Sequence, residues 1–185
     1  MCIRDRYEGF RERLANNGPH MPDFGPSNWS NKIEKFGAVV IGARKILVAY
    51  NVNVDEIDAI ASKKAGSLVR SSGRLLKSND GKRTRIPGML EMVQGMGLPL
   101  EAHNISQVSM NLRDVSKTPM HIAYEAVRSI VNDHGVETCG SELVGLVPLS
   151  AMLDSGRWYA PEGCEDEAKL VEAAIEGLGL SSLSA

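Results

Sequence analysis

Several residue types are scarce in this sequence, and each shortage excludes a class of protein. The three cysteines, Cys2, Cys139 and Cys164, lie far apart, which excludes a disulfide-rich secreted domain and favours a reducing cytoplasm. Only 5% of the residues are aromatic, too few for a platform on which nucleic-acid bases stack. The longest apolar run, residues 36–43, is much shorter than the roughly 20 residues that cross a bilayer. The charged stretch 1–6 shows no signal peptide.

A surplus of one charge is also missing. The chain has 21 basic and 23 acidic residues and a net charge of −2, so its composition does not attract a phosphate backbone. None of the four histidines stands at metal-ligand spacing, and no nucleophile elbow, phosphate loop or dinucleotide fingerprint is present. The hydrophobic fraction of 43% and charged fraction of 24% are globular. We therefore expect a cytoplasmic globular protein that binds neither nucleic acid nor membrane, with no assigned metal ligand or catalytic residue.

The order of apolar patterns predicts an α+β fold. A helix at 7–14 and a proline- and glycine-rich loop at 16–35 precede a β-rich region. Strands are predicted at 38–41, 45–54, 89–98, 105–112 and 136–147. From residue 45 onward, strands and helices follow the split βαβ pattern of a ferredoxin-like βαββαβ sandwich, with an extra N-terminal strand and C-terminal helices.

Helix signals fit the same pattern. Asp55 is expected to cap the first helix, whose apolar stripe comprises Ile57, Ile60, Ala61 and Leu68. Thr118 as N-cap and Pro119 at N1 predict the start of the second helix, which ends at 133–135. Further helices are predicted at 148–153 and 165–178. The segment 74–85, between the first helix and the strand at 89–98, is interpreted as a polar, basic loop.

The sheet face turned away from the helices is the most informative feature. We expect Val48, Val52, Val108 and Met110 to pack under the helices. Because side chains alternate along a strand, five polar side chains then lie on the opposite face of the sheet: Asn51, Asn53, Gln107, Ser109 and Asn111. Amides donate and accept at once, which suits a heterocycle with mixed hydrogen-bonding edges. The alternative is an ordinary polar face, solvated or packed on a neighbouring domain.

Two other segments are candidates for binding. In the loop 22–29, two prolines fix the backbone while Gly25 permits close approach to a ligand, although a stiff linker explains the same composition. A basic run could attract a polyanionic tail, although a solvated loop is the alternative. This run comprises Arg74, Lys77, Lys82, Arg83 and Arg85.

Four segments together resemble the formiminotransferase (glutamate formimidoyltransferase) family. They are Pro22-Asp23-Phe24-Gly25-Pro26, Gly42-Ala43-Arg44 with Ala49-Tyr50-Asn51-Val52-Asn53, the strand Gln107 to Leu112, and Gly140 to Leu149. They occur in the family's order and at nearly its spacing, and the likeness covers about residues 7 to 183. No single segment would be specific, but the combination is.

The resemblance implies transfer of a formimino group from N-formimino-L-glutamate to the co-substrate tetrahydrofolate, in histidine breakdown. Folate is expected in a channel between two ferredoxin-like subdomains. The loop contact implied by the family falls on Gly25, Pro26, Ser27 and Asn28, and on Phe36 and Gly37 beyond it. We expect the amides of Asn51, Asn53, Gln107 and Asn111 to line or support the same channel or the contact between subdomains.

The resemblance also implies that part of the enzyme is missing from this chain. The family's proposed general base is a histidine in a segment like Gly-Glu-His-Pro-Arg, which is absent here, and His20 does not replace it. We therefore interpret the chain as a fragment that lacks the catalytic N-terminal subdomain, its expected partner, and that is inactive alone. A homodimer is implied. The predicted divisions are 1–36, subdomain tail and folate-contacting linker; 37–156, C-terminal subdomain; and 157–185, helical extension.

A different class of function stays open at this point. A non-catalytic ferredoxin-like module could bind a small molecule through the same amides. An upstream coding sequence with a Glu-His-Pro segment would favour the enzyme, whereas a start codon near Tyr7 would favour the module. An RNA-binding sandwich ranks last because it needs aromatic side chains on the open face.

Overall fold

The computed structural model describes residues 23–26, 28, 30–36, 39 and 41–180 of the chain. The chain divides into two compact units, 1–43 and 44–185. In the described part of the first unit, the short helix α2 (Asn31–Phe36) begins where Ser30 Oγ accepts a hydrogen bond from the Ile33 N–H. The predicted helix at 7–14 lies outside the described residues. Val39 and Ile41 belong to no strand, so the extra N-terminal strand is not seen at these two positions.

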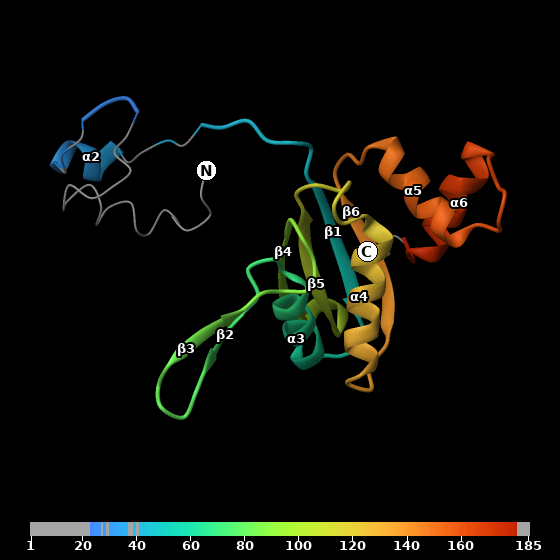
Figure 1. The fold of residues 1–185 in the computed structure, drawn as a ribbon, viewed down its shortest axis with the longest axis horizontal. Helices are drawn as coiled ribbons and strands as arrows, with labels where there is room; N and C mark the ends of the chain where they lie inside the picture. The colour runs from blue at the N-terminus through green and yellow to red at the C-terminus, as the bar shows by residue number, and fades with distance from the viewer. Residues whose placement is uncertain (1–22, 27, 29, 37–38, 40, 181–185) are drawn as a thin grey trace. The chain divides into compact units, whose positions relative to one another are not determined.

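A four-stranded antiparallel sheet is the centre of the second unit. Its spatial order is β4-β5-β1-β6. The strands are β1 (Val48–Val54), β4 (Val93–Leu100), β5 (Ile105–Leu112) and β6 (Thr138–Val144). Helices α3 (Ile60–Val69) and α4 (Met120–Asn132) lie together against the sheet (Figure 1). A one-turn 3-10 helix, η1 (Glu101–His103), joins β4 to β5. This βαββαβ arrangement confirms the predicted ferredoxin-like α+β class.

The strand alternation gives the core as predicted. In β1, Val48, Tyr50 and Val52 are buried, and in β5 Val108 and Met110 are buried on the same side. The helices contribute matching small and branched side chains to this core, among them Ala61, Ala65, Val69, Ala123, Val127 and Val131. Residues of odd number in both strands are therefore left on the face away from the helices.

Helix α3 approaches β4 unusually closely because glycines meet at the contact. A Cβ added at Gly97 would lie 2.1 Å from the Ser62 carbonyl carbon, and one added at Gly66 would lie 2.6 Å from Gly97 N. Such separations are impossible for a real side chain, so only glycine permits this packing. The close contact holds the helix layer directly over one edge of the sheet.

The start of α3 differs from the prediction. Glu56, not Asp55, supplies the cap: its carboxylate accepts hydrogen bonds from Ala61 N at 2.9 Å and Ser62 N at 2.6 Å. Ala59 adopts a left-handed conformation directly before the first turn, so the helix begins only at Ile60 and Ile57 lies outside it. Ile57 and Ile60 are both exposed, and the predicted stripe was wrong at these positions.

The second predicted cap was also wrong in detail. Helix α4 begins at Met120, one residue later than expected, and Pro119 occupies the N-cap position instead of N1. Thr118 instead donates its hydroxyl hydrogen to the Glu91 carbonyl oxygen at 2.7 Å, which ties the helix start to the segment before β4. At the other end Gly135, with a φ of 73°, stops the helix near the predicted position.

The predicted basic loop contains a hairpin. Strands β2 (Arg74–Lys77) and β3 (Arg83–Ile86) pair with each other and form a separate two-stranded sheet. A turn joins them: Ser78 N donates to Lys82 O, and Gly81 adopts a φ of 82°. Figure 1 shows the hairpin extending away from the four-stranded sheet. The segment was interpreted as a loop because of its basic composition, although it also contains the β-forming residues Leu75, Leu76, Thr84 and Ile86.

Two helices follow the sheet, α5 (Leu149–Tyr159) and α6 (Glu167–Gly177), and they pack against each other. The first extends beyond the predicted end at Leu153. Asp166 caps the second by accepting hydrogen bonds from Ala168 N and Lys169 N. None of the helices in the described residues has the length and apolarity needed to cross a membrane.

The chain after α6 returns to the sheet beside β6. Ser141 N donates to Gly179 O at 2.7 Å, and Ser141 and Leu180 form a parallel bridge. The buried Ser141 hydroxyl donates to Leu178 O at 2.6 Å and accepts from the Tyr50 hydroxyl at 3.1 Å. Burial raises the pKa of Tyr50 far above its usual value. The uncharged hydrogen bonds of Tyr50 and Ser141 therefore hold the end of α6 against the centre of the sheet.

Candidate functional site: the amide face

Five polar side chains lie on the sheet face opposite α3 and α4. We call this surface the amide face, defined by Asn51, Asn53, Gln107, Ser109 and Asn111. The β1–β5 register places Asn51 opposite Ser109 and Asn53 opposite Gln107. Asn111 lies opposite Ala49, one pair further along. Because side chains of directly paired residues share a face, the predicted grouping on adjacent strands is confirmed.

Three of the strands contribute to a hydrogen-bonded cluster on this face. Gln107 Nε2 on β5 donates to Asn53 Oδ1 on β1 at 2.8 Å and to Glu142 Oε2 on β6 at 3.3 Å. The other Glu142 oxygen lies 3.5 Å from Asn53 Nδ2, a long contact. Asn53 and Gln107 are buried, with exposed fractions of 1% and 6%. Their amides are therefore fixed rather than free to rotate.

The remaining polar side chains of the face, two amides and one hydroxyl, are free to bind a ligand. Asn51, Ser109 and Asn111 are half-buried, and their side chains make no hydrogen bond within the part of the chain that the structure describes. On the β4 side, Met96 and Leu98 stand opposite Ser109 and Gln107. The face thus offers several donors and acceptors beside an apolar strip. Such a surface suits a flat, polar heterocycle with one apolar side.

Glu142 is the member of this site that the sequence reasoning missed. The β6 register places it opposite Asn51, on the same face as the amides. Its position within a predicted strand, in alternation with Gly140 and Val144, was a usable signal. The strand was expected from residue 136 and begins only at Thr138, so the sequence pattern alone did not fix its register against β1.

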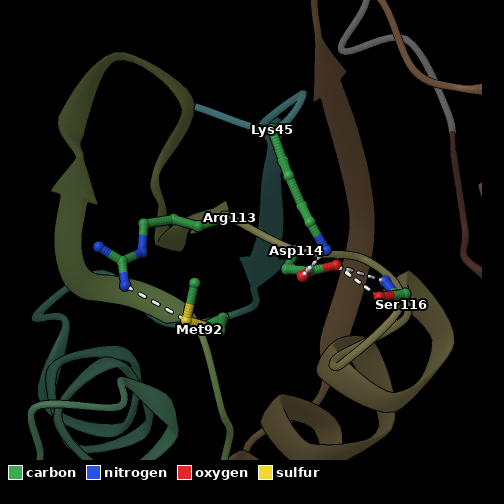
Figure 2. Close-up of polar contacts among 5 residues, drawn as sticks. All are labelled: Lys45, Met92, Arg113, Asp114 and Ser116. Atoms are coloured by element: carbon green, nitrogen blue, oxygen red, sulfur yellow. Dashed lines mark hydrogen bonds and ion pairs between the residues drawn. The ribbon is translucent and has the colours of Figure 1, made fainter. Parts of the chain in front are cut away.

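An ionic cluster stands beside the end of β5, where the chain enters β1. Figure 2 shows Lys45 reaching Asp114, which also accepts hydrogen bonds from Ser116. The Lys45 Nζ lies 2.6 Å from Asp114 Oδ2. The hydrogen bond from Lys45, followed by that from Ser116, lowers the pKa of Asp114 to about 2. Asp114 therefore stays ionised and anchors the segment before β1.

Neighbouring Arg113 points the other way. Its guanidinium lies 3.4 Å from the sulfur of Met92 (Figure 2), and its Nε is buried without a partner in the structure described here. Arg113 therefore does not join the Lys45–Asp114 ion pair, whose role here is to hold the segment before β1.

Comparison with known proteins decides the family. The sequence model of the formiminotransferase domain matches residues 49–185, which begin at the second residue of β1 and include the rest of the sheet. The chain belongs to the formiminotransferase family. The resemblance predicted from the four sequence segments is thereby confirmed.

Relatives of this formiminotransferase chain are longer than it is. The formimidoyltransferase-cyclodeaminases of Rattus norvegicus and Dictyostelium discoideum are 38% and 40% identical over 181 residues, or 96% of this chain and 31% of each relative. The glutamate formimidoyltransferase of Thermoplasma acidophilum is 35% identical over 171 residues, or 92% of this chain and 50% of that protein. The chain therefore spans between about a third and a half of these relatives.

The linker residues of the formiminotransferase prediction lie in the first unit. Gly25, Pro26, Asn28 and Phe36 are exposed, and Phe36 ends α2. Ser27 and Gly37 lie outside the described residues. The amide face belongs to the second unit, so the folate contact of the linker stays a prediction. The predicted domain boundaries likewise stay predictions beside the observed division at residue 43.

Burial shifts the pKa of two further side chains of this formiminotransferase chain, His121 and Cys139. His121 stacks on Trp158 with ring centroids 5.1 Å apart, and burial lowers the pKa of this histidine. Burial likewise raises the pKa of Cys139. Across the described residues, no three His, Cys, Asp or Glu side chains gather where they could hold a metal ion.

Proposed function

We propose that this chain is part of a glutamate formimidoyltransferase that moves a formimino group from N-formimino-L-glutamate to tetrahydrofolate in histidine breakdown. The observation that carries the proposal is the family match over 49–185, which coincides with the amide face. Mixed donors and acceptors beside an apolar strip suit the reduced pterin ring of the co-substrate. In this view the chain supplies one wall of the folate channel.

The proposal assigns the proton transfer to residues outside this chain. The described residues of the second unit place no histidine on the amide face, whereas the attacking folate amine needs a base poised near neutral pH. We therefore expect an N-terminal subdomain to carry the general base and to form the opposite wall. Gly25, Pro26, Ser27, Asn28, Phe36 and Gly37 would then contact folate between the two walls.

The reaction itself is the first test. The protein encoded by the complete gene is incubated with tetrahydrofolate and either N-formimino-L-glutamate or N-formyl-L-glutamate, and the folate product and released glutamate are quantified. Transfer from the formimino derivative, with slower or no transfer from the formyl derivative, supports the proposal. Folate-independent ligand binding without transfer of either group would instead favour a non-catalytic binding module.

Asn111 tests the amide face directly. Its amide makes no side-chain hydrogen bond among the described residues, so its replacement costs little stability unless another surface covers it. The Asn111→Ala variant of the complete protein is expected to bind tetrahydrofolate about fivefold to tenfold more weakly, as for the loss of one hydrogen bond. Ser150→Ala, on the exposed first turn of α5, is the control. Unchanged folate affinity and unchanged stability would remove Asn111 from the site.

A further inference from the structure

The neighbours of Gln107 decide which way its amide faces. Its Nε2 lies 2.8 Å from Asn53 Oδ1 and 3.3 Å from Glu142 Oε2. A carboxylate oxygen accepts hydrogen bonds and does not donate them, so Gln107 must turn its nitrogen toward Glu142. The second Glu142 oxygen attracts Asn53 Nδ2 in the same way, which leaves Asn53 Oδ1 to accept from Gln107. One carboxylate therefore sets the orientation of both amides.

Once these bonds are made, Gln107 has only an acceptor left to offer. Both hydrogens of Nε2 are occupied, and Oε1 has no partner among the side chains and backbone that the structure describes. The residue is 94% shielded, since its exposed fraction is 6%. A largely buried carbonyl oxygen with a free lone pair is a specific receptor for an N–H group.

We propose that Glu142 is a positioning residue that holds Gln107 as a hydrogen-bond acceptor for an amidine-type N–H of a bound substrate. The inference rests on the proposed function, in which both substrates carry such a group. N-Formimino-L-glutamate has it in the formimino group, and tetrahydrofolate has it at the amino end of the pterin ring. Glu142 acts through Gln107 and has no contact of its own with the substrate. A carbonyl edge of a ligand is disfavoured at this point because Gln107 has no N–H left for it.

The Glu142→Gln substitution tests the inference in the complete protein. The new amide keeps the size of Glu142 but can face Gln107 with either its oxygen or its nitrogen, so Gln107 loses its fixed orientation. We expect the KM for the substrate bound by Gln107 to rise about tenfold, as for one lost hydrogen bond, while kcat changes less than about twofold. Glu172→Gln, which makes the same charge change on the exposed surface of α6, is expected to leave both constants unchanged.

The two substrates are separate arms of this experiment. A rise in the KM of N-formimino-L-glutamate assigns the acceptor to the formimino N–H, and a rise in the KM of tetrahydrofolate assigns it to the pterin. Either result supports the inference. Unchanged KM values for both substrates in a folded Glu142→Gln variant overturn it, as does an equal effect of Glu172→Gln.

Side-chain amide signals give a readout that does not depend on turnover. In the 185-residue chain, the Nε2 protons of Gln107 are expected to exchange slowly with water, and Glu142→Gln should accelerate this exchange at least about tenfold. Equal exchange in the wild type and the variant overturns the positioning role. If the complete protein transfers no formimino group, the proposed function fails. In that case the inference is tested by adding each substrate to the 185-residue chain. A shift of the Gln107 side-chain amide signals with either substrate supports the inference, and no shift with both overturns it.

Discussion

At the scale of single residues, Ser141 connects three parts of the fold. Its hydroxyl donates to Leu178 O at 2.6 Å and accepts from the hydroxyl of Tyr50, and all three groups are buried. The Ser141→Ala variant leaves two buried polar groups without a partner, so we expect it to lose about 2–3 kcal/mol of unfolding free energy. Urea denaturation measures this loss. Ser150→Ala is the exposed control, and a change below about 0.5 kcal/mol for Ser141→Ala would show that the network is not stabilising.

Asp114 makes the stability of the chain dependent on pH. Its pKa falls from 3.8 to about 2 through the hydrogen bonds from Lys45 and Ser116. A carboxyl with a lowered pKa stabilises the folded state above its ordinary pKa and loses this contribution as the pH falls through the lowered value. Thermal unfolding should therefore show Asp114→Asn less stable than the wild type at pH 7, with the difference shrinking between about pH 4 and pH 2.

The matched control for this prediction is Asp154→Asn. Asp154 pairs with Arg157 at 3.0 Å, but both side chains are more than half exposed, so solvent screens the pair. Its substitution is expected to change the melting temperature little at any pH. A difference between Asp114→Asn and the wild type that stays constant from pH 7 to pH 2 would contradict the assigned cause.

The residues of the candidate site show how far sequence reasoning reaches. Asn51, Asn53, Gln107 and Asn111 could be placed together because a strand turns alternate side chains to one face, and the observed register agrees. Alternation groups Glu142 with Gly140 and Val144, but whether this group shares the face of the amides depends on how β6 pairs with β1. The pairing includes an irregularity at Asn53 and Val54, which no local pattern announces.

At the scale of elements, the β2–β3 hairpin is the main departure from the sequence prediction. It was interpreted as a loop because five basic residues outweighed its β-forming residues. By contrast, β5 was predicted at its observed bounds. An uninterrupted alternation of polar and apolar residues over eight positions is compatible with a strand and with little else. The starts of α3 and α4 were misassigned because contacts beyond the local sequence determine the capping: Glu56 accepts from the first turn of α3, and the Thr118 hydroxyl bonds to Glu91 O instead of to α4.

The hairpin also carries a testable function at this scale. Arg74 is half-buried, but Lys77, Lys82, Arg83 and Arg85 are exposed, so we propose that they attract the anionic tail of polyglutamylated folate. The double variant Lys82→Gln/Arg83→Gln of the complete protein should weaken binding of polyglutamylated tetrahydrofolate about threefold to tenfold and leave the monoglutamate nearly unaffected. Equilibrium binding at low and high salt measures both, and salt should remove the difference.

An equal change of charge elsewhere provides the comparison for the hairpin. Lys117→Gln/Lys169→Gln removes two exposed basic side chains outside β2 and β3. If it weakened polyglutamate binding as much as the hairpin variant, the effect would belong to net charge and not to the hairpin.

At the scale of the whole molecule, the chain has a folded core of its own and spans only part of the length of its relatives. It spans 31% of the formimidoyltransferase-cyclodeaminase of Rattus norvegicus and 50% of the glutamate formimidoyltransferase of Thermoplasma acidophilum. We expect the isolated 185-residue chain to unfold cooperatively in urea yet to transfer no formimino group. Turnover is measured with both proposed substrates, beside the complete protein as positive control. Measurable transfer by the chain alone would show that the general base lies within it.

The two edge strands of the sheet, β6 and β4, are protected from further strand pairing in different ways. Along β6 the returning segment pairs at Ser141 through Leu180, so part of this edge is already occupied. Strand β4 forms the other edge, where Pro99 has no N–H to offer and Gly95 and Gly97 lower the tendency to extend pairing. Further strand pairing is thus hindered at each edge, by the returning chain at β6 and by proline and glycine residues at β4. The fold resists open-ended strand-to-strand aggregation while its broad amide face stays available for recognition.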